Sequence, residues 1–299
     1  MADTKDLKSF GGCLRASSSL VVGTIFLSFF ICKLYNFKVM EYLLKKLTVN
    51  NEQISYYVKE NNAKWTVLFV HGYNSSSDFA SELFHLKQNF NIIALNLPGS
   101  HYLEKPRQGL SVNYFYQIIN TFIKHHLRIH HLILLGHSLG GAVVAPLSKN
   151  KKVKRVIYLS PIHPHIIKSK SWKKLHAFYF PTNNNHKLNS EIESHLGKGG
   201  LYLDLIKNDL LNYDYITGTL NDDYKMSLRK KPLFIIGDND HLIETKQFVE
   251  FVTKDLKQKI KIIPQTSHNP IQEKPYLFND LLNREIRWKK RLWPLKIIK

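Results

Sequence analysis

The run at residues 132–145 constrains the fold of this chain more than any other, because a strand pattern passes directly into a helix pattern. The run opens with four consecutive apolar residues, which is typical of a buried strand in a parallel sheet. It continues as Gly-His-Ser-Leu-Gly and then as an apolar, alanine-rich stretch with helical character. So tight a turn needs residues without a Cβ beside its apex, and Gly136 and Gly140 supply them. The pattern therefore predicts that Ser138 is the strained apex, with its hydroxyl exposed over the carboxyl ends of the strands.

Strand and helix patterns alternate at short intervals around this run. Such alternation predicts right-handed crossovers and a mostly parallel sheet, in one large domain with a real core. An alternating pattern on either side of the Asn50-Asn51 turn predicts an antiparallel hairpin at residues 43–60. The other predicted strands lie at 65–70, 91–97, 153–159, 232–237 and 261–264, and the predicted helices at 79–86, 112–129, 241–256 and 275–287.

Four separate motifs resemble those of an α/β-hydrolase of the serine esterase/lipase type. They are Val-Leu-Phe-Val-His-Gly at 67–72, Gly-His-Ser-Leu-Gly-Gly at 136–141, Phe-Ile-Ile-Gly-Asp-Asn-Asp at 234–240, and His268. The resemblance extends over residues 46–282. It implies a mostly parallel sheet with helices on both faces, and a hydrolase that works without a cofactor or a metal. A Gly-Ser turn in some other doubly wound fold is the alternative interpretation.

A serine hydroxyl is a poor nucleophile at neutral pH, so it needs a base, and the base needs an orienting acid. In this fold the three follow one another in the order Ser, acid, His. The resemblance therefore assigns Ser138 as nucleophile, Asp240 as acid and His268 as base. Asp238 is the alternative acid, and a turn or helix cap is the structural role open to either aspartate. His268 is singled out among 15 histidines because it follows the last predicted strand.

The oxyanion that develops during acyl transfer needs two preorganised N–H donors, worth roughly 3 kcal/mol each. The turn after Ser138 is expected to supply the Leu139 N–H, and the loop after His71-Gly72 the Tyr73 N–H. Gly72 lets this backbone approach a substrate closely, and the His71 side chain is expected to brace the loop. A serine at position 138 argues against epoxide hydrolases and haloalkane dehalogenases of this fold, which use aspartate there.

The alternation of strands and helices stops between residues 165 and 231. Related hydrolases insert a helical cap at this place, after the sixth strand, and the aromatic content here argues against a disordered loop. We expect the cap to set substrate choice with an apolar inner face. The candidate wall residues are Phe178, Tyr179, Phe180, Tyr202 and Leu205. The organisation expected is then an N-terminal segment at 1–40, a core at 41–164 and 232–290, a cap at 165–231, and a basic tail at 291–299.

Residues 16–32 carry no charge and are mostly apolar. The length of this segment is at the lower limit for crossing a bilayer. No cleavage motif follows them, so we expect a retained membrane anchor on an otherwise cytoplasmic protein. A buried or interfacial helix is the alternative. Basic residues flank both ends of the segment, so the distribution of charge does not orient it.

The formal net charge of +20 is compatible with attraction to an anionic membrane or to nucleic acid. The lysines are spread along the whole chain, which favours a general compositional bias, and no nucleic-acid recognition motif is present. Both cysteines, Cys13 and Cys32, lie outside the predicted enzyme domain, so no disulfide framework is expected. The scattered histidines lack carboxylate partners at metal-ligand spacing, and no metal is expected.

These observations favour a hydrolase of carboxylic esters, lipid-derived ones included, that acts through an acyl-enzyme on a small-molecule substrate. The same triad serves thioesterases, amidases and peptidases, because it does not choose the leaving group. A noncatalytic, membrane-tethered binding protein of the same fold is the alternative from another class. The acyl group, the alcohol, the membrane side and the oligomeric state stay open.

Overall fold

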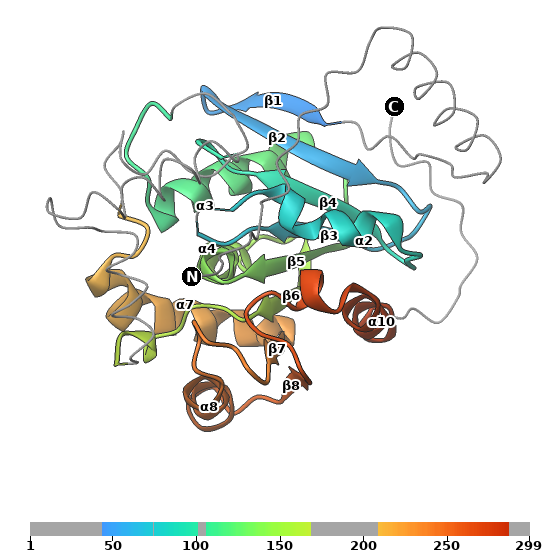
Figure 1. The fold of residues 1–299 in the computed structure, drawn as a ribbon. Helices are drawn as coiled ribbons and strands as arrows, with labels where there is room; N and C mark the ends of the chain where they lie inside the picture. The colour runs from blue at the N-terminus through green and yellow to red at the C-terminus, as the bar shows by residue number, and fades with distance from the viewer. Residues whose placement is uncertain (1–43, 74, 101–105, 169–208, 287–299) are drawn as a thin grey trace, which may run out of the picture. The chain divides into compact units, whose positions relative to one another are not determined.

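A single β-sheet lies at the centre of the part of the chain that the structure describes (Figure 1). The structure is a computed structural model that describes residues 44–73, 75–100, 106–168 and 209–286. Eight strands form one sheet in the order β1-β2-β4-β3-β5-β6-β7-β8. The β1-β2 and β2-β4 pairs are antiparallel and every other pair is parallel. The strands are β1 Lys45–Val49, β2 Glu52–Lys59, β3 Thr66–Val70, β4 Asn91–Asn96, β5 Leu132–His137, β6 Val153–Leu159, β7 Leu233–Gly237 and β8 Ile260–Ile263.

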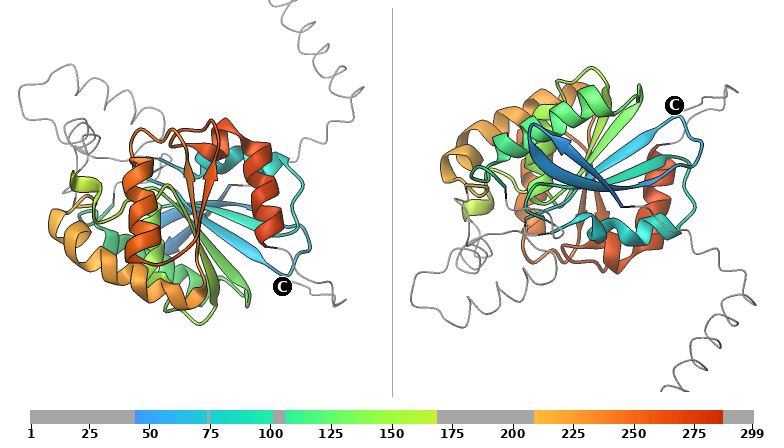
Figure 2. Two further views of the ribbon diagram at one scale, coloured as in Figure 1. Left: turned by 90° about the horizontal axis from the view of Figure 1, so that it is seen from below. Right: turned by 90° about the horizontal axis from the view of Figure 1, so that it is seen from above.

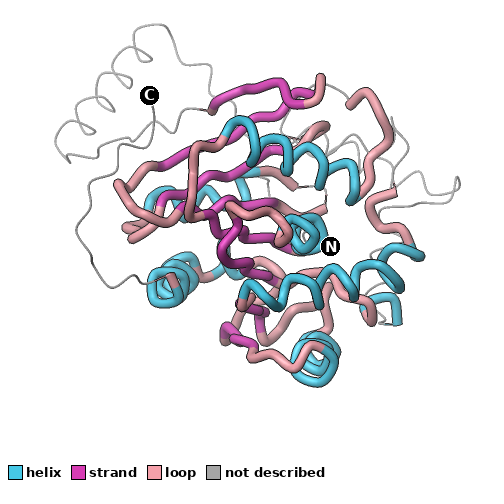
Figure 3. Tube along the Cα trace, turned by 180° about the vertical axis from the view of Figure 1, so that it is seen from behind, coloured by secondary structure: helices cyan, strands magenta, loops and turns pink. Residues whose placement is uncertain are grey.

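Helices cover both faces of this sheet, as Figures 2 and 3 show. They are α2 Ser81–His85, α3 Val112–Thr121, α4 Leu139–Leu147, α7 Leu220–Ser227, α8 Thr245–Glu250, α9 Pro270–Glu273 and α10 Pro275–Glu285. Short tight or widened turns extend several of them, at η1 Ser77–Ala80, η2 Phe122–His126, η3 Ile166–Lys168, η4 Tyr215–Thr219, η5 Leu228–Lys230 and η6 Phe251–Asp255. The expected architecture, a mostly parallel sheet with helices on both faces, is confirmed.

Two apolar clusters, one on each face, explain why the central strands β3 and β5 are buried at every position. Successive side chains of a strand point to opposite faces. Leu68 and Val70 of β3 accordingly join the cluster under α3, α4, α7 and α8. Val67 and Phe69 join the cluster under α2 and α10. All five residues of β3 and all six of β5 are buried, so neither strand has a solvent-facing side.

The C-terminal part of the predicted cap lies on the sheet in this structure. Between β6 and β7, the segment formed by η4, α7 and η5 packs against α4, and the Tyr224 hydroxyl donates to the Ile162 carbonyl at 2.6 Å. Burial of Leu220 and Tyr224 places this helix in the layer that covers the sheet. The wall residues proposed for the cap, 178–180, 202 and 205, lie outside the described residues, so that expectation stays a prediction.

The chain divides into two units, residues 1–41 and 42–299, and every element named above belongs to the second unit. The predicted anchor at 16–32 lies outside the described residues. Within the ranges that the structure describes, no helix is both long and apolar enough to cross a membrane.

Candidate active site

Ser138 stands between the end of β5 and the first residue of α4, in a backbone conformation with φ 52° and ψ −119°. Such a conformation costs a residue with a side chain about 1–3 kcal/mol and needs support from its surroundings. The Ser138 N–H donates to the Leu159 carbonyl of β6 at 3.0 Å, and the Ser138 carbonyl accepts from Gly141 and Ile162 N–H. β6, the loop after it and the first turn of α4 therefore hold the apex together.

The two glycines beside the apex are required by close backbone contacts. A Cβ on Gly136 would lie 2.5 Å from the Gly140 carbonyl oxygen, and a Cβ on Gly140 would clash with the Val70 carbonyl at the end of β3. No flexible side chain can move away to make room at either position. The reason given for both glycines from the sequence is confirmed by these contacts.

Asp240 and His268 are brought together from the ends of neighbouring strands, β7 and β8. The His268 Nδ1 lies 2.9 Å from Asp240 Oδ2 and 3.1 Å from Oδ1. The side chains are 7% and 0% exposed, so water does not compete for the contact. Asp240 Oδ1 also accepts from the N–H groups of Leu242 and Ile243. The carboxylate is therefore fixed on two sides, with the imidazole on the third.

Two opposing effects set the pKa of Asp240. Burial alone would raise the pKa of this carboxyl, but the charge and hydrogen bond of His268 and the backbone hydrogen bond of Ile243 outweigh it. The net result is a pKa below the usual aspartate value. Asp240 is thus an anion at neutral pH, as the orienting acid of a catalytic histidine must be.

The alternative acid, Asp238, has a different set of partners. It is exposed, and its Oδ1 accepts from the Thr266 N–H at 3.2 Å. Hydrogen bonds from backbone amides, that of Gln265 foremost, lower the pKa of its carboxyl. Asp238 therefore supports the loop that leads to His268, while Asp240 contacts the imidazole itself.

A cavity of about 280 Å³ lies over the carboxyl ends of the strands and contains the predicted site residues. Ser138, Leu139, Tyr73, Gly72 and His268 all line it. Within the described residues no hydrogen bond joins the Ser138 hydroxyl to His268, and such contacts often tighten only with substrate present. The remaining lining residues are the apolar Phe79, Ile162, Leu211, Leu242 and Ile243 and the polar Ser75, His137, Asn269 and Gln272.

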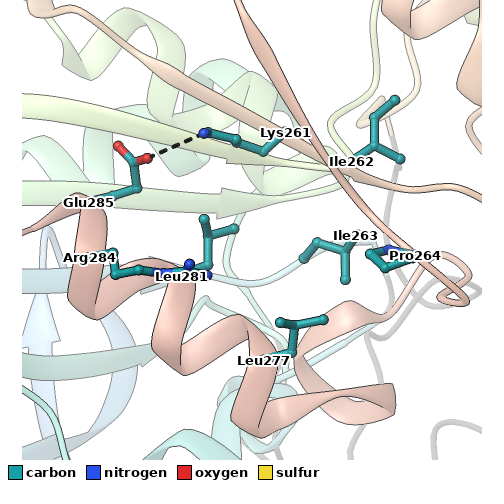
Figure 4. A pocket seen from close by; sticks show the side chains of 8 residues that line it. All are labelled: Lys261, Ile262, Ile263, Pro264, Leu277, Leu281, Arg284 and Glu285. Carbon is teal, nitrogen blue, oxygen red and sulfur yellow. Dashed lines mark ion pairs between the residues drawn. The ribbon is translucent and has the colours of Figure 1, made fainter.

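Two other cavities are of similar size but lack this chemistry. One, of about 310 Å³, lies between β8 and α10 and holds the Lys261–Glu285 ion pair at 3.8 Å (Figure 4). The other, of about 370 Å³, lies beside His125 and Arg128. Neither contains a serine or cysteine among its described lining residues. Groups of three or more potential metal ligands are also absent from the part of the chain that the structure describes.

Two residues that sequence reasoning did not single out hold the loop of His268. The Glu273 carboxylate accepts from the N–H groups on both sides of that histidine, Ser267 at 2.6 Å and Asn269 at 3.1 Å. The His137 Nε2 lies 2.9 Å from the His268 carbonyl oxygen. Glu273 could have been suspected as an acid in the first turn of the helix that follows His268. The bond of His137 could not have been predicted, because the sequence does not indicate the direction in which the His137 ring points.

Comparisons with known proteins agree with this geometry. The family profile described as "alpha/beta hydrolase fold" matches residues 66–198. A Mycoplasma genitalium protein named "Putative esterase/lipase 2" is 28% identical over 239 residues, which cover 74% of this chain and 89% of that protein. A Mycoplasma pneumoniae protein of the same name is 23% identical over 246 residues, covering 75% and 90%. A solved N-acyl homoserine lactonase shares the fold, with TM-score 0.62 and 14% identity over 82% of this chain and 96% of its own.

Proposed function

Because this chain is an α/β-hydrolase of the esterase/lipase type, we propose that it cleaves carboxylic esters through an acyl-enzyme formed on Ser138. The observation that carries the proposal is the buried contact of Asp240 with His268, at a cavity that Ser138 also lines. Nucleophile, base and orienting acid follow the ends of β5, β8 and β7, which lie in the same half of the sheet. This arrangement suits acyl transfer.

The proposed reaction begins when His268 Nε2 takes the proton of the Ser138 hydroxyl as its oxygen attacks the ester carbonyl. The negative charge on the carbonyl oxygen is held by the N–H groups of Leu139 and Tyr73. Leu139 is the first residue of α4, so its N–H is one of those that a helix leaves without an internal partner. Asp240 stabilises the imidazolium and keeps the Nδ1 proton facing the carboxylate.

The tetrahedral intermediate then breaks its bond to the alcohol oxygen, which takes the proton from His268 Nε2 and leaves. Water next enters, gives a proton to His268 and attacks the acyl-serine. The second intermediate breaks its bond to Ser138, whose oxygen recovers the proton. The acid leaves and the enzyme is restored. The apolar residues of the cavity supply a wall for the acyl group, lipid-derived chains included. Thioesters and amides would follow the same steps with another leaving group.

Labelling with a fluorophosphonate probe tests this proposal without knowledge of the natural ester. We expect one equivalent of label on Ser138, none on a Ser138→Ala variant, and hydrolysis of p-nitrophenyl esters by the parent alone. The matched control is Ser148→Ala, which removes a buried serine from the other end of α4. Label on another residue, or hydrolysis that survives Ser138→Ala, would overturn the assignment. An ester series of increasing acyl length would then identify the substrate class.

A further inference from the structure

The ring of His137 touches all three segments that carry the proposed site. It belongs to the turn of Ser138, its Nε2 lies 2.9 Å from the His268 carbonyl oxygen, and its centroid lies 4.8 Å from that of the His268 ring. A Cβ on Gly72, in the loop expected to hold the oxyanion, would stand 3.2 Å from His137 Nδ1. On its other face the ring stacks on Phe79 at 4.2 Å and an interplanar angle of 18°.

The protonation state of this ring follows from its surroundings. Burial, and then the charge of His268, lower the pKa of His137 to about 3, so the ring is neutral at physiological pH. A carbonyl oxygen only accepts hydrogen bonds, so the single ring proton is on Nε2 and is donated to His268. The bare Nδ1 is buried, with no hydrogen-bond partner in the described chain. A neutral ring here adds no positive charge beside the imidazolium that His268 becomes during the reaction.

We propose that His137 is a positioning residue, whose hydrogen bond to the His268 carbonyl sets the place of the catalytic imidazole relative to Ser138. This inference rests on the proposed function. The contact with Asp240 fixes the Nδ1 side of the imidazole, and without a second attachment the ring could still move with its backbone. The bond from His137 supplies that attachment from inside the molecule, and it comes from the residue adjacent to the nucleophile. Nucleophile and base are thereby fixed to one another.

Glu273 does not replace this attachment. Its carboxylate holds the two amides beside His268 from the exposed side of the loop. It fixes the course of the backbone, whereas His137 determines how close the backbone of His268 lies to the turn of Ser138. The same ring packs beside Gly72, so it also spaces the expected oxyanion loop from that turn.

Two substitutions separate the hydrogen bond from the shape of the ring. His137→Phe keeps an aromatic ring on Phe79 but leaves the His268 carbonyl without a donor, whereas His137→Gln carries an N–H at a similar reach. With p-nitrophenyl acetate we expect His137→Phe to lower kcat by about 10- to 100-fold, the scale of a small misplacement, with KM little changed. The acid limb of its kcat/KM–pH profile should be shifted along the pH axis relative to that of the parent. His137→Gln should recover most of the rate and the parental profile.

The control is His131→Phe, which replaces a histidine at the opposite end of β5, beside Trp65 and away from the cavity. It should leave kcat and the pH profile unchanged. Equal losses in His137→Phe and His137→Gln, or a folded His137→Phe variant with parental kcat and profile, would overturn the inference. Labelling distinguishes a failure of the positioning role of His137 from a failure of the proposed role of Ser138. If Ser138 of the parent reacts with the fluorophosphonate and His137→Phe reacts equally fast, only the positioning role fails.

A measurement on the parent protein does not depend on whether the variants fold. Nitrogen-15 NMR of the histidine rings reports the tautomer and the charge of each one. We expect His137 to be neutral, with its proton on Nε2, throughout the pH range in which the enzyme is active. A ring that is protonated on both nitrogens in this range, or that carries its proton on Nδ1, would contradict the proposed bond.

Discussion

At the residue scale, the site depends on a few atoms whose neighbours leave little freedom. Ser138 keeps a strained backbone because β6 holds its N–H and the two glycines beside it have no Cβ. Asp240 keeps its charge in a buried place because an imidazole and two amides compensate for the lost water. The effect of a substitution should therefore depend on which of these contacts it removes.

Removing the nucleophile tests the central assignment. Ser138→Ala should lower kcat for p-nitrophenyl ester hydrolysis by about 10⁴-fold or more, because the alcohol that forms the acyl-enzyme is lost. The thermal midpoint should stay close to that of the parent, since alanine meets the same backbone strain as serine. Steady-state kinetics and circular dichroism provide the two measurements. Activity near that of the parent would assign the chemistry to another residue.

The two aspartates after β7 should differ sharply in their effect on turnover. Asp240→Asn replaces the anion that contacts His268 Nδ1, so kcat should fall by about 10⁴-fold. Asp238→Asn keeps an oxygen for the Thr266 N–H and should cost less than about tenfold, because an exposed hydrogen bond contributes little. Comparing kcat of the two variants at one pH decides the matter. The reverse ranking would make Asp238 the orienting acid.

At the scale of elements, the sequence pattern agrees with the structure where the pattern of apolar residues is regular. The residues of β3, β5, β6 and β7 are mostly apolar because both faces of the sheet are covered there, and such runs are visible in the sequence. Lys154 and Arg155, near the start of β6, are exceptions. The helix expected at 112–129 ends as a regular helix at Thr121 and continues as a wider turn to His126. The sequence does not predict α7 as a sheet-covering helix, because α7 is polar on average and follows a long run without alternating strand and helix patterns. Its packing on α4 depends on contacts distant in sequence, which periodicity does not report.

The α7 helix carries a buried carboxyl group, Asp223, that we expect to weaken the fold at neutral pH. Burial raises the pKa of Asp223, and the hydrogen bond from the Tyr215 hydroxyl at 3.2 Å only partly offsets this. An acid whose pKa is raised on folding stabilises the fold at low pH, and this contribution is lost as the pH rises through the folded-state pKa. Asp223→Asn should therefore raise the free energy of unfolding at neutral pH and not in acid. Urea unfolding at the two pH values measures it.

Asp222→Asn is the matched control, because Asp222 is the exposed neighbour on the same helix turn. It should change the free energy of unfolding by no more than a few tenths of a kcal/mol. Equal effects of the two substitutions at neutral pH would mean that burial of Asp223 is not the cause. A larger effect of Asp223→Asn in acid than at neutral pH would contradict the sign of the argument.

At the scale of the whole molecule, the sequence predicts the order and type of most elements, and with them the strand ends at which Ser138, Asp240 and His268 lie. It does not predict the bonds of His137 and Glu273 to the His268 loop. Those bonds depend on side-chain directions that are decided only when β5, β6, β7 and β8 have assembled in the sheet. The resemblance already favours Asp240 over Asp238 as the acid, and the structure adds the contact of Asp240 with the imidazole.

Membrane attachment belongs to this scale and is our proposal for residues 16–32. We expect the expressed full-length protein to stay in the membrane pellet after alkaline carbonate extraction, because an uncharged apolar segment of this length favours the hydrocarbon core. The control replaces Ile25 and Phe29 in the same segment with lysines, which should release the protein. Release of the parent into the supernatant, or a mature chain that begins beyond Cys32, would contradict the proposal.

The strand order also bears on the time at which the protein becomes reactive during its synthesis. Chains emerge from the ribosome amino terminus first, at about 5–20 residues per second. The strand that carries Ser138 is in the middle of the sheet, but His268 follows β8 at the edge and is anchored by α9. A nascent chain can therefore form the turn of Ser138 and still lack its base. Reactivity with a serine-directed probe would mark the moment at which the carboxyl-terminal part of the sheet has docked, so stalled chains of graded length would date the completion of the fold.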